Sequence, residues 1–244
     1  MKDKINRKLN AVILIVTMVI ALIVLICEDY FRTTLNYKPF IIFGGLIIVF
    51  DFYVILFQTS TKRLITLIPV AGIAGYITQA VGTSCNIWVY TNQPQTFFIA
   101  AFMFIFASIA MYGLTTKVLA MPKHSLSKTK SRLFNICWIS GLFFFLVVTS
   151  QKFKNDINSF FLIYYGFLFV FAIYSSLKLR VSTMISLTLS AWIVGFASEY
   201  FGSQAGIWLF EKSNNFPPAY LVGGSWPFEF ILHYSLSAMI AKET

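Results

Sequence analysis

Long apolar runs separated by short polar segments make up most of the chain. Eight of these runs approach the roughly 20 residues that an α-helix needs to cross the ~30 Å hydrocarbon core of a membrane. The expected helices are 10–27, 39–57, 64–84, 97–114, 133–149, 157–176, 181–201 and 221–241. The pattern therefore predicts an all-α membrane protein with about eight transmembrane helices.

Composition and charge agree with a membrane protein. With 58% hydrophobic and 11% charged residues, and a mean hydropathy of +0.76, the 244 residues have too little polar surface to cover a soluble globule. A net charge of +10 would suggest nucleic acid as a partner of a soluble protein. If the connections alternate between two sides, however, 14 of the 19 Lys and Arg residues fall on the side of the N-terminus. The positive-inside rule then predicts both termini in the cytoplasm, in a membrane that we take to be the bacterial cytoplasmic membrane, and explains the charge without nucleic acid.

The second half of the sequence repeats features of the first half at an offset of 120 residues. The aligned positions are Gln79 with Glu199, Gly82 with Gly202, Ile87 with Ile207, Trp88 with Trp208, and Tyr90 with Phe210. The expected helices of the two halves follow the same offset. Because four helices is an even number, both halves would have the same orientation. We expect two parallel four-helix repeats, 1–120 and 121–244, in a single membrane-embedded unit.

Glu199 places a carboxyl group in the seventh expected helix. An ionisable group in a membrane segment costs several kcal/mol, so it marks a candidate functional site. Residues three or four positions apart share one face of a helix. The residues on this face are Thr188, Trp192, Gly195, Glu199 and Gly202. The glycines would admit a neighbouring helix closely; the alternative for Glu199, near the helix end, is a carboxylate that reaches water.

Glu229 lies where the last helix is expected to begin. The residues that disfavour a helix before it are Pro217, Pro218, Gly223, Gly224 and Pro227. Proline removes a hydrogen-bond donor and clashes with the preceding turn, so we expect the regular helix to begin near Trp226. The 15 residues 227–241 would span roughly 22 Å. Glu229 would then face an internal cavity from the first turn of a short helix, or, alternatively, only offset the helix dipole.

His233 follows Glu229 by four residues and shares its helical face, where the two could form a proton relay. A protonated Glu229 in an apolar pocket would act as a general acid. The pair lacks the second acidic cluster that a metal site of this kind needs, so we expect no metal. Asp51, in the middle of 39–57, either pairs with a polar group across the bundle or contributes to the site.

Residues 197–241 resemble the small membrane carotenoid cyclases of the heterodimeric or fused lycopene-cyclase type, and the related carotenoid hydratases. The shared pattern is an acid followed by Gly, Trp and an aromatic residue, a Pro- and Gly-rich stretch, and then Pro-x-Glu and an aromatic residue. The matching residues are Glu199, Gly202, Gly206, Trp208, Phe210, Pro218, Gly223, Gly224, Pro227, Glu229 and Tyr234. The chain departs from the family at Phe230, where a second acid is usual, and at Gln79, where the first half has no acid.

The resemblance implies a cofactor-free, non-redox enzyme of the isomerase class that acts on the end group of a polyene, with an isoprenoid or membrane lipid as substrate. Glu229 would donate the proton, and Glu199 or His233 would act as base or orienting partner. The π face of Trp208 would stabilise the cation. The other expected substrate contacts are Gly202, Trp226, Trp192, Gln79, Trp88 and Asp51.

Two other functions stay open. Broken backbone beside an intramembrane acid is equally typical of a transporter or proton-coupled carrier. A non-catalytic membrane protein on the same scaffold would explain the tryptophans as an aromatic belt at the membrane surface. The sequence also leaves open whether the chain forms a homo-oligomer.

Overall fold

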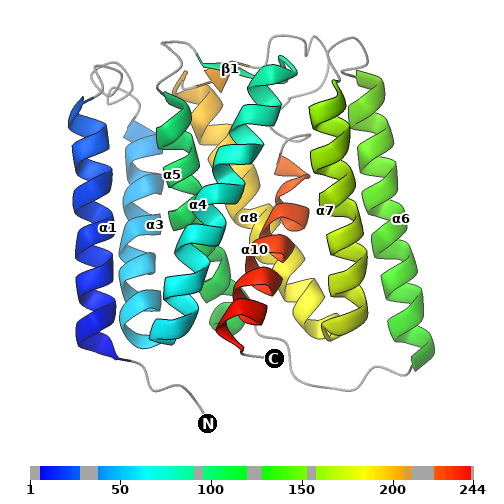
Figure 1. Cartoon of the computed structure of the whole chain (residues 1–244), viewed down its shortest axis with the longest axis horizontal. Helices are drawn as coiled ribbons and strands as arrows, with labels where there is room; N and C mark the ends of the chain where they lie inside the picture. Colours follow the sequence, from blue (N-terminus) through cyan, green and yellow to red (C-terminus); the bar gives the residue numbers. More distant parts are fainter. Residues whose placement is uncertain are drawn as a thin grey trace.

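The computed structural model describes residues 6–27, 38–90, 96–119, 128–152, 158–206, 208–209 and 223–242. These segments form eight α-helices that stand roughly upright beside one another, with α1 at one edge and α6 at the other (Figure 1). The helices are α1 (Arg7–Cys27), α3 (Lys38–Phe57), α4 (Thr61–Ser84), α5 (Thr96–Gly113), α6 (Lys128–Lys152), α7 (Ser159–Lys178), α8 (Val181–Gln204) and α10 (Trp226–Ala241). Each of the eight apolar runs overlaps one helix, so the all-α prediction is confirmed.

Short elements complete the described chain. A π-helical turn, η1 (Leu114–Val118), continues α5. Two strands, β1 (Val89–Tyr90) and β2 (Trp208–Leu209), pair antiparallel at one end of the bundle. They join the segment that follows α4 to the segment that follows α8.

Side-chain caps explain where two of the helices begin. The Ser60 side chain accepts a hydrogen bond from the Arg63 backbone N–H at 3.1 Å at the start of α4. The Asn158 side chain accepts one from the Phe161 N–H at 3.0 Å at the start of α7. Both caps satisfy a backbone donor that has no partner inside the helix.

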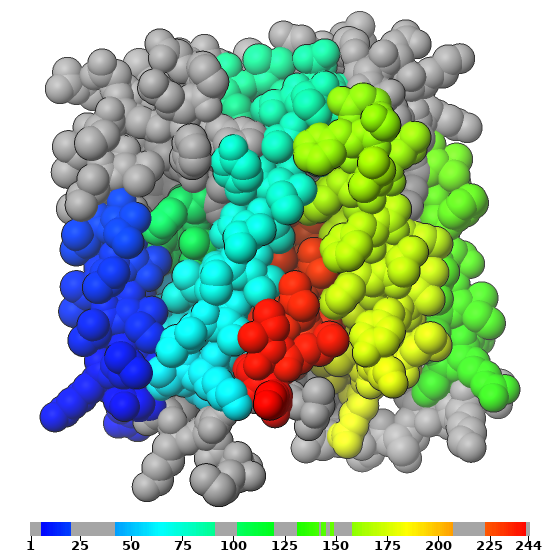
Figure 2. All heavy atoms as spheres, in the orientation of Figure 1, coloured from blue at the N-terminus to red at the C-terminus, as the bar shows by residue number. Residues whose placement is uncertain are grey.

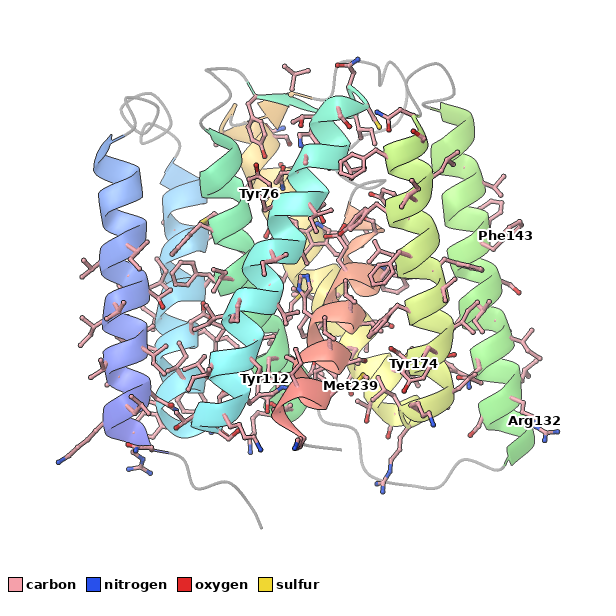
Figure 3. All side chains as sticks on the ribbon, viewed as in Figure 1. Tyr76, Tyr112, Arg132, Phe143, Tyr174 and Met239 are labelled. Atoms are coloured by element: carbon pink, nitrogen blue, oxygen red, sulfur yellow. The ribbon has the colours of Figure 1, made fainter. Side chains whose placement is uncertain are left out.

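The exterior of the bundle is apolar. Helices α4, α7 and α8 are long and apolar enough to cross a membrane. On two of them, Ile73, Ile163 and Val170 are between 64% and 69% exposed. On α6, Phe143 is 59% exposed and points away from the bundle (Figure 3). Apolar side chains spread over a whole exterior are typical of a protein surrounded by lipid.

Basic residues gather at one end of the described bundle. Arg132, at the lower end of α6 in Figure 3, belongs to this set. The other helix-terminal members are Arg7, Lys8, Lys62, Arg63, Lys117, Lys128, Lys130, Lys178, Arg180 and Lys242. In the described residues, the opposite end holds Lys38 and Lys152. The described helices thus carry their positive charge asymmetrically.

The 120-residue offset recurs in the structure. Helices α4 and α8 each have 24 residues, and their bounds differ by this offset at both ends. Two residues with positive φ, Asn86 (49°) and Gly206 (69°), follow the two helices at equivalent positions. The strand pair that matches Val89 with Leu209 joins two equivalent positions as well.

Helix α10 lies in the centre of the bundle, in contact with α4, α7 and α8. Its first turn lies near mid-height, and its last turn lies at the end where α1 begins (Figure 1). On the face shown in Figure 2, α10 fills the lower part of the space between α4 and α7. The regular helix begins at Trp226, as predicted.

Arg63 anchors α10 at the basic end. Its side chain is 2% exposed, and its Nη2 donates a hydrogen bond to the Tyr234 carbonyl at 2.5 Å. The guanidinium lies 4.6 Å from the ring centroid of Tyr234 and 5.3 Å from that of Tyr112, which stack on each other at 6.0 Å. A charged donor on a backbone carbonyl and two cation–π contacts therefore join α4, α5 and α10.

Replacing Arg63 with Met should lower the free energy of unfolding by about 2–4 kcal/mol, because it removes a charged hydrogen bond and two cation–π contacts. The measurement is the thermal unfolding midpoint in detergent micelles. Arg132→Met, at an exposed position of the same end, is the matched control and should change stability by about 0.5 kcal/mol or less. Equal midpoints for the two variants would contradict the anchoring role.

Candidate active site

Glu229 lies in the first turn of α10 with only 2% of its side chain exposed. Thr78 Oγ1, from α4, donates to Glu229 Oε2 at 3.2 Å. Ser225 Oγ, just before α10, donates to Oε1 at 3.4 Å. In the part of the chain that the structure describes, these hydroxyls are its hydrogen-bond partners and no Lys or Arg pairs with it. A buried acid is thus held by neutral groups alone.

The hydroxyl network extends beyond Glu229. The Tyr164 hydroxyl, from α7, and Thr78 Oγ1 hydrogen-bond at 2.6 Å, and Thr78 Oγ1 also lies 3.0 Å from the Ala74 carbonyl. When Glu229 is ionised, Tyr164 can donate to Thr78 and Thr78 to the carboxylate. When Glu229 is protonated, it can donate to Thr78, which then donates to Ala74. Because a hydroxyl both donates and accepts, the same atoms accommodate Glu229 before and after it gives up a proton.

Glu199 of α8 is hydrogen-bonded to α10 through the side chain of Trp226. The indole Nε1 donates to Glu199 Oε1 at 3.0 Å, and Glu199 is 7% exposed. Both acids singled out from the sequence therefore adjoin the first turn of α10.

Two neighbours hold the side chain of Trp226. It stacks on Phe104 of α5 with ring centroids 4.8 Å apart. It also packs against Gly195 of α8, where a Cβ atom would come within 2.4 Å of the indole Cγ. Gly195 and Glu199 are one turn apart on α8, so this face provides both space for the ring and an acceptor for its N–H.

His233 does not bond directly to Glu229. It is 1% exposed, and its Nδ1 lies 2.8 Å from Ser108 Oγ of α5. Glu229 instead accepts a hydrogen bond from Thr78 of α4. The predicted Glu229–His233 relay is therefore not formed by direct contact. Four residues turn a helix by about 40° more than a full turn, which directs the two side chains to different neighbouring helices.

Gln79 and Trp88 hydrogen-bond to each other at the end of the bundle that carries β1 and β2. The Trp88 Nε1 donates to Gln79 Oε1 at 3.0 Å, and the Tyr90 hydroxyl donates to the same oxygen. Gly82 provides room for the Trp88 ring, since a Cβ atom there would overlap it at 2.0 Å. These contacts hold the turn after α4 against α4 itself.

Three further residues were predicted to contact the substrate: Trp192, Gly202 and Trp208. Trp192, which shares a helical face with Glu199 by its spacing, is 42% exposed, so much of its side chain faces away from the neighbouring helices. Gly202 is buried on α8, as the shared face predicts. Trp208 pairs with Tyr90 through its backbone, and its side chain lies outside the described residues.

Asp51 is fully buried in α3. Neither of its carboxyl oxygens has a hydrogen-bond partner among the described residues, so the expected polar partner across the bundle is not found there. The neighbouring turn of α3 contributes Val54 and Ile55 to an apolar cluster. Asp51 thus lies in apolar surroundings, apart from the hydroxyl network of Glu229.

Sequence reasoning missed the hydroxyl groups that surround the acids: Thr78, Tyr164, Ser225 and Ser108. Serine and threonine in apolar helices often bond to the carbonyl four residues earlier, as Thr78 does with Ala74, so their presence alone carries little functional signal. Only the packing of α4, α5 and α7 around α10 brings them to the acids.

No family model, curated protein or solved structure matches the chain. Within the described residues, no group of three or more His, Cys, Asp or Glu side chains could hold a metal ion. The interpretation of the site therefore rests on its own geometry.

Replacing Gly195 with Ala should displace Trp226 and lower the free energy of unfolding by about 1–3 kcal/mol, because a methyl group cannot fit against the indole. Gly166→Ala on α7 is the control: a Cβ atom there meets nothing within 4 Å, and alanine favours a helix. Thermal unfolding in detergent checks both variants. A Gly195→Ala variant as stable as Gly166→Ala would show that Trp226 is not held in this way.

Proposed function

We propose that the protein is an integral membrane enzyme that performs acid–base chemistry on an isoprenoid or related lipid, similar to the lycopene cyclases. Glu229 is the proton donor. The observation that carries this proposal is the hydroxyl network of Thr78, Tyr164 and Ser225, which holds a buried acid without any cation among the described residues and suits both of its protonation states. A cation beside the acid would instead favour the ionised form, which cannot donate a proton.

The reaction needs no cofactor. Glu229 transfers its proton to one carbon of a double bond, and a carbocation forms at the other carbon. If Glu199 accepts a proton from a carbon next to this cation, a double bond forms again and the net change is an isomerisation. If a second double bond of the substrate first attacks the cation, a carbon–carbon bond closes a ring and the cation moves to a new carbon, from whose neighbour Glu199 accepts the proton. The aromatic faces of Trp226 and Phe104, stacked beside Glu199, would stabilise the cation by cation–π attraction.

Glu199 takes the role that a second adjacent acid has in the resembling family. Phe230, at that position, is fully buried in an apolar cluster with Trp226 and Phe104. The hydrogen bond to Glu199 from Trp226, three residues before Glu229 on α10, supports this assignment. Two carboxyl groups sharing an apolar site are most stable when one of them carries a proton, which suits a donor and an acceptor in one reaction.

We also propose that all eight helices cross a bacterial cytoplasmic membrane as two parallel four-helix repeats, 1–120 and 121–244, with both termini in the cytoplasm. The first and last residues of α4 and α8 differ by 120 positions at both ends, which supports the repeat. The basic residues at one end of the described helices support the orientation.

Cysteine labelling of intact cells tests this topology. In a chain with Cys27, Cys85 and Cys137 replaced by Ala, a membrane-impermeant maleimide should label Gln204→Cys and spare Arg132→Cys, because the two exposed positions lie at opposite ends of the bundle. After the cells are opened, both should react. Labelling of Arg132→Cys in intact cells would reverse the proposed orientation.

Glu229→Gln tests the chemistry, because the amide keeps the shape of the side chain and cannot donate a carboxylic proton. In lycopene-producing cells, the wild-type chain should change the carotenoid profile, and Glu229→Gln should lower product formation by about 100-fold or more. Chromatography with mass spectrometry measures the products, and Trp192→Phe, at an exposed position, is the active control. An unchanged profile despite good membrane expression of the wild type would reject carotenoid chemistry.

A further inference from the structure

Ser108 and His233 form a buried pair between α5 and α10. Ser108 is completely buried and His233 is 1% exposed, and the Ser108 hydroxyl oxygen lies 2.8 Å from His233 Nδ1. The other ring nitrogen, Nε2, is buried and has no hydrogen-bond partner in the described part of the chain. A buried polar atom without a partner costs about 1–3 kcal/mol, so this nitrogen marks a place where a group from outside the chain would bind.

The Ser108 hydroxyl can accept from a protonated His233 Nδ1 or donate to an unprotonated one. Each arrangement leaves one polar hydrogen and one acceptor without a partner among the described residues. In both arrangements Nε2 is the ring nitrogen that is open to a further hydrogen bond. When Ser108 donates to Nδ1, the ring hydrogen lies on Nε2, which then presents an N–H group.

An aromatic residue packs against the pair. The ring of Phe104 meets that of His233 edge to face at 6.5 Å, and its stacking on Trp226 links this place to Glu199. A ligand that reaches Nε2 would thus be mostly apolar and would carry a single oxygen acceptor. Glu229 and His233 are one helical turn apart on α10 but contact different neighbouring helices, so the oxygen at Nε2 and the double bond at Glu229 would be different parts of one elongated ligand.

We propose that His233 Nε2–H binds a hydroxyl or carbonyl oxygen at the end of an isoprenoid or other lipid chain, and that Ser108 is the residue that positions this donor. The site binds an oxygen-bearing ligand more tightly than a pure hydrocarbon of the same length, which it still accepts through its apolar chain. Because the ligand is the one whose double bond Glu229 would protonate, this assignment rests on the proposed function. The assignment differs from the proposed function because it concerns how the ligand is recognised, and binding does not require turnover.

Nitrogen NMR of the full chain in lipid nanodiscs tests the pair directly. The chain has two histidines, so His124→Gln leaves His233 as the only labelled ring after growth on ¹⁵N-histidine. The spectrum should show a protonated Nε2 and an unprotonated Nδ1. Ser108→Ala should give a mixture of the two forms, and Ser108→Thr, which keeps the hydroxyl, should restore the single form.

Two probes of equal length distinguish the ligands: geranylgeraniol and the corresponding hydrocarbon without the hydroxyl group. Geranylgeraniol should shift the Nε2 resonance, and the hydrocarbon should leave it in place. The concentrations needed for equal thermal stabilisation should differ by about 3- to 10-fold in favour of the alcohol, as expected for one neutral hydrogen bond. His233→Phe should abolish this preference, whereas Glu229→Gln should keep it.

The outcomes separate recognition from chemistry. If the wild-type chain and every variant show no turnover but the alcohol preference is retained, the proposed function is overturned and the binding site stands. Equal responses of the wild type to both probes, or a ring protonated at Nδ1, would overturn the binding site; equal responses would then assign the Nε2 position to a water molecule. If His233→Phe does not fold, the wild-type NMR comparison still decides between these results.

Discussion

The burial of one carboxyl group inside an apolar bundle is the constraint on which the rest of the structure depends. Glu229 cannot be solvated by water at 2% exposure, so neighbouring helices must supply its hydrogen bonds. Thr78 supplies one from α4, and Ser225 supplies another from the segment that precedes α10. Because α10 begins at mid-height, its first turn carries this acid into the interior of the bundle (Figure 1).

The tryptophan at the start of α10 connects this constraint to helix packing. Trp226 bonds to Glu199, stacks on Phe104 and fills the space left by the missing side chain of Gly195. One residue thereby sets the distance between α5, α8 and α10. Because the same residue precedes Glu229 by three positions, the packing of three helices and the position of the acid are determined together.

Periodicity and the helix-breaking residues were enough to predict the helices and the start of α10 near Trp226. They failed where tertiary contacts decide. Spacing placed His233 with Glu229, but the neighbouring helices direct them apart, and spacing alone could not show that Trp192 faces outwards. The hydroxyl of Ser108 gave no signal, because a serine in an apolar helix has the same sequence pattern whether or not it meets a histidine.

The buried guanidinium of Arg63 has a consequence for biosynthesis. Its contacts with Tyr112 and Tyr234 come from α5 and α10, and α10 follows every other helix along the chain. During synthesis the Arg63 side chain of α4 would lack its carbonyl acceptor until Tyr234 has emerged from the ribosome. Nascent chains cut short before α10 would therefore expose this guanidinium and the ring of Tyr112 without their partner, a feature by which cellular proteases could recognise incomplete molecules.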